Sequence, residues 1–484
     1  MTKIADFFRA FVNGISRSRI SVIGSIMTTI ILPVLLVSVT LDMQGVIKNP
    51  YFGFLIYMVM GPMCVIGVIC IFAGVFLFKG NEDIGLFAIE YLKEQFNLPG
   101  RFTRIRRLMF LAAFLTLFTI FLVGIIAYTG FHYTESVSFC GQFCHSVMEP
   151  EYVTYQNSPH SRVSCVKCHI GEDSQWFTKA KISGARQLLA TALNNYERPI
   201  MTPIGGLRPM REVCEQCHRP EMFHGDKLYV KDKFLPDEQN THLQTVMVMK
   251  VGAGGYLGHD AQGIHWHVSP THKIYYTYND QAREDISKIK LIDHDGSESV
   301  FARKDNSADK EGAQEREMDC MDCHNRPTHI YLAPEEALDR KMVSNEIPAE
   351  IPYIKRQALA AITGKYHTVN QARQEISSKL RSWYKEHYPE FIGGKAELLE
   401  QAINGASKAY AENVFPEMGV LWRTYRNFIG HEGGSGCFRC HDEEHYSADG
   451  KVISKDCQLC HIILVEDEPA LDITELLKNR KHGP

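Results

Sequence analysis

Residues 139–171 read FCGQFCHSVMEPEYVTYQNSPHSRVSCVKCHIG and contain the pattern that decides the character of the chain. Within this stretch, two thiols and an imidazole lie within five residues of one another, as Cys165-Val-Lys-Cys168-His169. Cys-x-x-Cys-His is the attachment signature of c-type haem, because the thiols form thioethers with the vinyl groups and the histidine binds the iron from the proximal side. The sequence therefore predicts a covalent haem at this point.

The same pattern occurs four more times, and together with an earlier variant it gives six motifs, numbered here in chain order. Motifs 2 to 6 are Cys165–His169, Cys214–His218, Cys320–His324, Cys437–His441 and Cys457–His461. Their second cysteines are Cys168, Cys217, Cys323, Cys440 and Cys460. Five copies use most of the 14 cysteines of the chain, which favours haem over the alternatives of zinc knuckles or disulfides.

Motif 1, Cys140-Gly-Gln-Phe-Cys144-His145, has one extra residue between its thiols. We expect it to bind a sixth haem c, with a disulfide or a pair of free thiols as the alternative. Met148 follows closely and offers a thioether that can bind iron.

Six haems need up to twelve axial ligands, so further histidines are candidates for the distal side. Those beside a motif are favoured: His160, His329, His431 and His445. In His265-Trp266-His267, alternation along a strand would aim both rings at one face, so either could bind iron, and His267 is preferred. His224 is a weaker candidate. A surface or structural role is an alternative for each of these side chains.

Three apolar runs near the N-terminus predict membrane-spanning helices over residues 20–41, 51–78 and 108–128. Basic residues before the first run and between the second and third predict a cytoplasmic N-terminus. Everything after Tyr128 would then lie in the periplasm of a bacterium, at its inner membrane. We expect the arginines before the third run to contact lipid headgroups rather than nucleic acid.

The remainder divides by composition, in a chain expected to be mainly α with little regular structure around the haems. We predict a haem domain over 131–225 (haems 1 to 3), a small antiparallel β insert over 226–304, and a haem 4 segment over 305–333. A helical segment over 334–425 and a C-terminal haem pair over 426–484 follow.

Several blocks resemble the NapC/NirT family of membrane-anchored multihaem quinol dehydrogenases, above all its larger inner-membrane members. They are the opening stretch, KAKISGARQ (179–187), LRPMREVCEQCH (207–218), GIHWHV (263–268), MDCMDCHNRPTHIY (318–331) and GCFRCHDEEHY (436–446). The resemblance implies that haem 1 takes Met148 instead of His145, and that quinol binds beside Lys179 or Lys181. Arg186-Gln187 stands near the position expected for a carboxylate, so the proton acceptor is left open.

These expectations describe a protein that oxidises menaquinol or ubiquinol and passes electrons to a periplasmic cytochrome or reductase. From residue 129 onward there are 41 Lys and Arg side chains against 50 Asp and Glu side chains, a balance of −9 that favours a basic partner. The first two spans could also pair with a second copy of the chain. Two alternatives remain: a multihaem reductase with an open iron, and a subunit of a larger membrane complex without a quinol site.

Overall fold

A computed structural model of the chain describes residues 18–43, 55–77, 114, 121, 124–125, 128–143, 145–170, 174–202, 210–218, 225–252, 263–303, 312–431 and 435–469. The chain divides into two compact units. Unit 1 comprises Met1–Phe139 and Ile170–Ile182, and unit 2 comprises Cys140–His169 and Ser183–Pro484.

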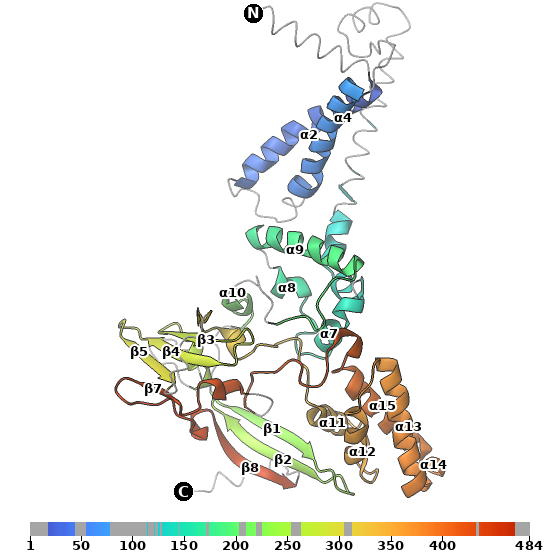
Figure 1. Ribbon diagram of the computed structural model, residues 1–484, viewed down its shortest axis with the longest axis vertical. Helices are drawn as coiled ribbons and strands as arrows, with labels where there is room; N and C mark the ends of the chain where they lie inside the picture. The colour runs from blue at the N-terminus through green and yellow to red at the C-terminus, as the bar shows by residue number, and fades with distance from the viewer. Residues whose placement is uncertain are drawn as a thin grey trace, which may run out of the picture. The chain divides into compact units, whose positions relative to one another are not determined.

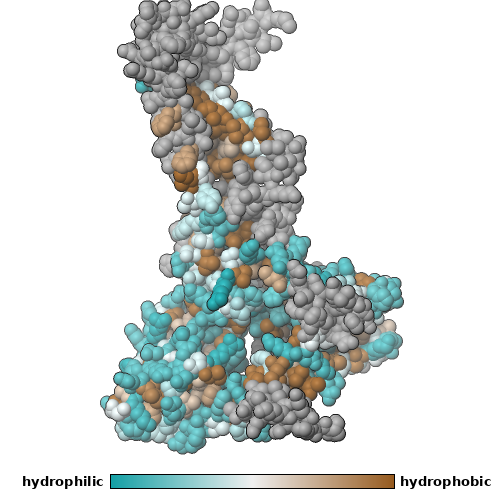
Figure 2. All heavy atoms as spheres, turned by 180° about the vertical axis from the view of Figure 1, so that it is seen from behind, coloured by the Kyte–Doolittle hydropathy of each residue, from teal (hydrophilic) through white to brown (hydrophobic). Residues whose placement is uncertain are grey.

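Unit 1 contains a close helix pair. Helix α2 (Arg19–Met43) packs against α4 (Gly61–Leu77), which follows the π-helical turn η1 (Leu55–Met60). The backbones approach because small residues face each other: a Cβ atom on Gly24 would lie 2.5 Å from the carbonyl oxygen of Gly67. Ser21 Oγ also donates a hydrogen bond across the pair to the Ile71 carbonyl at 2.9 Å. Large apolar side chains gather on the outer surface of this pair (Figure 2).

The prediction of three membrane-spanning helices is wrong. Among the described residues, no helix is both long and apolar enough to cross a membrane. The run predicted over 51–78 is divided, because its first described turn is π-helical and α4 itself has 17 residues. At 1.5 Å per residue, α4 is about 26 Å long, shorter than a hydrocarbon core of about 30 Å. Most of the run 108–128 lies outside the described residues.

Unit 2 is richer in strands than expected for a mainly α protein. Its described residues form eight strands in two antiparallel sheets, with the orders β1-β2-β8 and β6-β3-β4-β5-β7 (Figure 1). The strands are β1 (Lys227–Phe234), β2 (His242–Met249), β3 (Lys273–Tyr278), β4 (Ile286–Ile292), β5 (Glu298–Arg303), β6 (Gln314–Glu317), β7 (His445–Ser447) and β8 (His461–Pro469).

Strands β6, β7 and β8 lie beyond the predicted insert of 226–304, and this corrects the expectation of a small β insert among irregular haem segments. The apolar run that follows motif 6 forms β8, in which Ile462 pairs with Val248 and Ile463 with Met247 of β2. Such a β-branched run is typical of a strand.

Five helices form the main apolar core of unit 2: α11 (Pro334–Val343), α12 (Ile354–Ile362), α13 (Val369–His387), α14 (Glu390–Gly393) and α15 (Ala396–Ala411). On α13, the buried side chains Ile376, Leu380 and Tyr384 recur every four residues and so share one face. On α15, Gly405 allows close contact, since a Cβ atom there would lie 2.6 Å from the Glu346 carbonyl oxygen.

A buried polar cluster fastens the β1–β2 hairpin to these helices. The Asp339 carboxylate accepts hydrogen bonds from Phe234 N at 2.9 Å and Lys355 Nζ at 2.5 Å. Asn240, at the hairpin turn, donates to the Ile351 carbonyl at 2.8 Å and accepts from Lys355 N at 2.9 Å. Burial lowers the pKa of Lys355, although Asp339 opposes this effect. The sheet that includes β8 is thereby attached to the helical core.

Short elements carry the motifs and the segments beside them. They are η2 (Phe139–Phe143), α7 (His145–Gln156), α8 (Cys165–His169), α9 (Ser174–Ala192), α10 (Met210–Cys214), η4 (Ile264–Val268), η5 (Cys320–Asp322), η6 (Pro416–Met418), η7 (Gly436–Arg439) and η8 (Cys457–Leu459).

Candidate haem sites

Each described Cys-x-x-Cys-His motif forms one tight helical turn. The histidine N–H donates a hydrogen bond to the carbonyl oxygen of the first cysteine, at 2.8 Å in motifs 3 and 4 and 3.0 Å in motif 5. Motif 2 is the short helix α8. All described cysteines are free, so the disulfide alternative does not describe them. One turn therefore presents two thiols and a ring together, as covalent haem attachment requires.

The histidine of each of these five motifs faces a second histidine from elsewhere in unit 2. The distance between ring centres ranges from 5.8 to 6.4 Å. The pairs are His169 with His329, His218 with His160, His324 with His265, His441 with His267, and His461 with His431.

This separation suits an iron between the two rings. A histidine nitrogen binds such a metal at about 2.0 Å with the ring centre roughly 1.1 Å behind it, so rings on opposite sides of one iron are about 6.2 Å apart. Within the described residues, no group of three or more His, Cys, Asp or Glu side chains could hold a metal ion by itself. The pairs thus fit an iron whose other four ligands come from a porphyrin.

Hydrogen bonds on Nδ1 orient four of the ten rings. Nδ1 of His160 lies 3.0 Å from the Pro327 carbonyl oxygen, and Nδ1 of His267 lies 2.8 Å from that of Ile264. Nδ1 of His441 lies 2.8 Å from the carbonyl oxygen of Ser454, and Nδ1 of His329 lies 2.9 Å from that of Glu151. Because a carbonyl only accepts, Nδ1 carries the proton and Nε2 keeps its lone pair for a metal.

Burial also keeps several rings in the form that binds metal. It lowers the pKa of His169, His267 and His324, with smaller effects from neighbouring histidines. These rings are therefore neutral at pH 7, and a neutral imidazole is the ligand form.

The His265-Trp266-His267 segment serves two pairs. On a strand, as expected from the sequence, both rings would share one face, but the segment forms the 3₁₀ helix η4. In a three-residue turn, positions i and i+2 point in different directions. His265 accordingly faces His324 of motif 4, and His267 faces His441 of motif 5. The sequence presents the two histidines as alternatives, with His267 preferred, whereas each of them faces a different motif histidine.

His445 differs from the other candidates. Its side chain is fully buried, its Nδ1 lies 2.8 Å from Asp442 Oδ1, and its Nε2 lies 3.2 Å from the Ile286 carbonyl oxygen. Both ring nitrogens are engaged with protein oxygens, so neither is left for iron. These surroundings argue against His445 as a distal ligand, because its position beside motif 5 reflects packing against β4.

Comparisons with known proteins agree with this geometry. Residues 104–200 match the NapC/NirT cytochrome c family, N-terminal region. The chain is 37% identical over 447 residues to "Cytochrome c-type protein ImcH" of Geobacter sulfurreducens, an alignment that covers 91% of this chain and 87% of that protein. No solved structure matches the chain.

The chain belongs to the NapC/NirT cytochrome c family. It is therefore an electron-transfer cytochrome with covalently bound haem c. The five motif turns and their histidine pairs fit that group, since each supplies two thiols and two opposed imidazoles.

Motif 1 of this NapC/NirT chain is described in part. Cys140 lies in η2, which packs on α7: the Tyr152 ring occupies the space that a Cβ atom on Gly141 would take. Tyr152 also accepts a hydrogen bond from Gln142 Nε2 at 3.1 Å. Met148, on α7, is half-buried. Cys144 and the side chain of His145 lie outside the described residues, so the ligation of haem 1 stays a prediction.

The two lysines expected at the quinol site, Lys179 and Lys181, belong to helix α9. Their side chains lie outside the described part of the chain. His224, the weaker distal candidate, is also outside it.

The motifs of unit 2 adjoin one another in chain order. Neighbouring thiols influence each other from one motif to the next: a hydrogen bond with Cys140 lowers the pKa of Cys165 to about 7, and burial with a contribution from Cys437 raises that of Cys323 to about 12. The neighbouring pairs are Cys140 with Cys165, Cys168 with Cys217, Cys214 with Cys320, Cys323 with Cys437, and Cys437 with Cys460. Helix α10 also contacts both α8 and η5.

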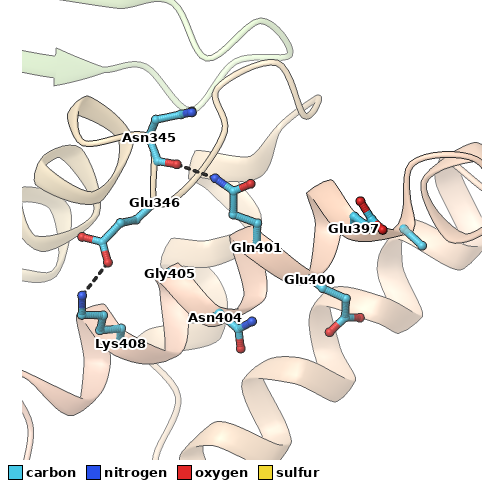
Figure 3. A pocket seen from close by; sticks show the side chains of 9 residues that line it. Asn345, Glu346, Glu397, Glu400, Gln401, Asn404, Gly405 and Lys408 are labelled. Atoms are coloured by element: carbon cyan, nitrogen blue, oxygen red, sulfur yellow. Dashed lines mark hydrogen bonds and ion pairs between the residues drawn. The ribbon is translucent and has the colours of Figure 1, made fainter.

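A cavity of about 660 Å³ lies apart from the motifs, where α15 meets the loop after α11 (Figure 3). Lys408 Nζ lies 2.7 Å from Glu346 Oε2 there, and Gln401 Nε2 donates to the Asn345 carbonyl at 2.6 Å. Most of the residues that line it are exposed, so the cavity is a hollow on the surface of the helical core.

Proposed function

We propose that this NapC/NirT cytochrome oxidises membrane quinol at the periplasmic face of the bacterial inner membrane and passes the electrons to a periplasmic redox protein. Six haems, when bound, would supply a series of one-electron carriers between the two-electron donor and the acceptor. The relative ImcH carries the name of a c-type cytochrome, and its similarity along most of the chain supports the electron-transfer role.

The histidine pairs are the observation that carries this proposal. Five opposed pairs, with ring centres 5.8 to 6.4 Å apart, would give both axial ligands to five irons. An iron with two histidines has no position for a substrate, so these sites favour electron transfer over reduction of a small molecule. The reductase alternative is correspondingly disfavoured.

The contacts between motifs support a single line of haems from 1 to 6. Each motif adjoins the next one in the chain, from Cys140 with Cys165 at one end to Cys437 with Cys460 at the other. Electrons that arrive at haem 1 would then leave from haem 6.

We place the quinol site beside motif 1 on the family resemblance. Met148 would bind the iron of haem 1, and Lys179 or Lys181 would hold the quinol oxygen by charge while its two protons leave on the periplasmic side. The excess of acidic residues after position 129 supports a basic protein as the acceptor, because opposite charges steer encounter.

The test uses purified haem-loaded protein in detergent. A reduced menaquinone analogue, added without oxygen, should reduce the haems within seconds, as followed by visible absorbance. The variant Lys179→Gln/Lys181→Gln should be reduced at least about tenfold more slowly, since loss of a charge that contacts a reacting oxygen costs one to a few orders of magnitude. Lys385→Gln, on helix α13 of unit 2, is the matched control and should behave as the parent.

Two outcomes would contradict the proposal. Dithionite could reduce every haem while the quinol analogue reduces none, which would favour a subunit without its own quinol site. Alternatively, the double variant could react as fast as the parent, which would remove these lysines from the site.

A further inference from the structure

A carboxylate lies against one of the paired histidines. His329, the partner of His169, places its Nδ1 3.2 Å from Glu151 Oε2, in addition to the 2.9 Å contact with the carbonyl oxygen of the same residue. The Glu151 side chain is only 17% exposed. The ring N–H of His329 therefore donates to the Glu151 carbonyl oxygen, and the largely buried carboxylate of the same residue lies beside that nitrogen.

Other histidines of the five pairs have neutral partners at Nδ1. Among the described residues, His160, His267 and His441 each meet a backbone carbonyl oxygen, at 2.8 to 3.0 Å. A carboxylate is a stronger hydrogen-bond acceptor than a carbonyl. A carboxylate close to Nδ1 of a ligating histidine makes Nε2, the nitrogen that binds the metal, a better electron donor. His329 is thus set apart from these rings by charge.

The position of Glu151 is supported by its surroundings. It belongs to α7, and the nearby guanidinium of Arg326 interacts with its charge. Arg326 is itself buried, lies 4.0 Å above the Tyr425 ring, and donates a hydrogen bond to Thr202 at 3.1 Å. The Glu151 carboxylate thus lies near a buried guanidinium as well as beside His329.

We propose that Glu151 is a positioning residue that lowers the reduction potential of haem 2 through its carboxylate, which lies 3.2 Å from Nδ1 of the distal ligand His329. This rests on the assignment of His169 and His329 to one iron under the proposed function. A stronger donor stabilises the oxidised iron more than the reduced iron, so the equilibrium moves toward oxidation. Helix α7 would thereby act on two neighbouring haems in opposite directions, because the Met148 thioether favours the reduced state of haem 1.

The experiment is a spectroelectrochemical titration of the purified six-haem protein, with electron paramagnetic resonance to separate the haems. Glu151→Gln keeps an acceptor at the same place and removes the charge. We expect the equilibrium constant for reduction of one bis-histidine haem to rise about tenfold, in line with outer-shell effects on metal sites. For a one-electron couple, this is a rise of 59 mV in the reduction potential. The g-values of the same haem should change, since they report the donor strength of the ligand.

Glu149→Gln is the matched control, because Glu149 is exposed on the same helix. Its titration should match that of the parent. The proposal is overturned if Glu151→Gln titrates as the parent does, if both variants shift equally, or if Glu151→Gln loses the haem, which would assign Glu151 a structural role. These readouts need no quinol, so a failure of quinol oxidation would be seen separately.

Discussion

His431 and His445 flank motif 5 on either side, yet the structure gives them different partners. The ring of His431 lies 6.3 Å from that of His461 and stacks on Phe438 at 4.5 Å. His445 is buried between Asp442 and the backbone of β4. Proximity in the chain could not separate these two histidines, because the role of each depends on which atoms its nitrogens meet.

His431→Ala should remove one axial ligand of haem 6 and produce a high-spin signal in electron paramagnetic resonance. His445→Ala should leave every haem low-spin, while its lost hydrogen bonds and cavity lower the stability by about 2–4 kcal/mol. Thermal melts followed by far-UV circular dichroism measure the second effect. A high-spin signal in His445→Ala, or its absence in His431→Ala, would contradict the assignment.

The sequence alone indicates the thiols and the motif histidines, because their chemistry depends on spacing within one turn. It predicts the distal pairs poorly. His329 follows motif 4 in the chain but faces His169 of motif 2, and His160 precedes motif 2 but faces His218 of motif 3. These pairs depend on how separate segments pack, which local spacing does not encode.

At the scale of elements, α15 packs closely on the loop before α12 because Gly405 has no side chain. Gly405→Ala would place a Cβ atom 2.6 Å from both the Glu346 carbonyl oxygen and Ile347 Cγ1. Since a backbone carbonyl cannot turn aside, we expect a loss of about 1–3 kcal/mol in thermal melts. Gly393→Ala is the control, because nothing lies within 4 Å of its Cβ position. Equal stability of the two variants would refute this packing.

The ion pair between α13 and α15 predicts a pH dependence. Arg381 donates two hydrogen bonds to the Glu400 carboxylate, at 2.6 and 2.8 Å, and lowers the pKa of Glu400. The folded pKa is below the unfolded value of about 4.3, so the stabilisation is complete above that value and is lost as the pH falls through the folded pKa.

Because this pair is about half exposed, its contribution is about 0.5 kcal/mol. Melts at neutral and acidic pH should show that Glu400→Gln loses less stability on acidification than the parent. Glu397→Gln, on the same helix, should follow the parent. An identical pH dependence in all three proteins would show that the pair contributes nothing.

Periodicity predicts helices between residues 334 and 425, where α11 to α15 lie, because each helix there buries one apolar face. It fails for η4 and β8. A strand and a 3₁₀ turn cannot be distinguished from five residues such as IHWHV, and β8 depends on β2, far away in the sequence. Hydropathy alone predicts three spans from the apolar N-terminal runs and does not detect the change from the π-helical η1 to the α-helix α4.

At the scale of the molecule, the histidine pairs connect segments that are distant in the chain. One segment, residues 320–329, supplies the motif 4 histidine and the partner of the motif 2 histidine. The turn η4 supplies the partners for motifs 4 and 5. If each pair holds an iron, the haems cross-link unit 2, so its fold and its electron path depend on the same contacts.

Near-infrared magnetic circular dichroism of the oxidised protein tests this account most directly, because it counts haems by the identity of their axial ligands. The account predicts five bis-histidine haems and one haem with a different ligand set. Fewer than five bis-histidine haems in the fully loaded protein would contradict it.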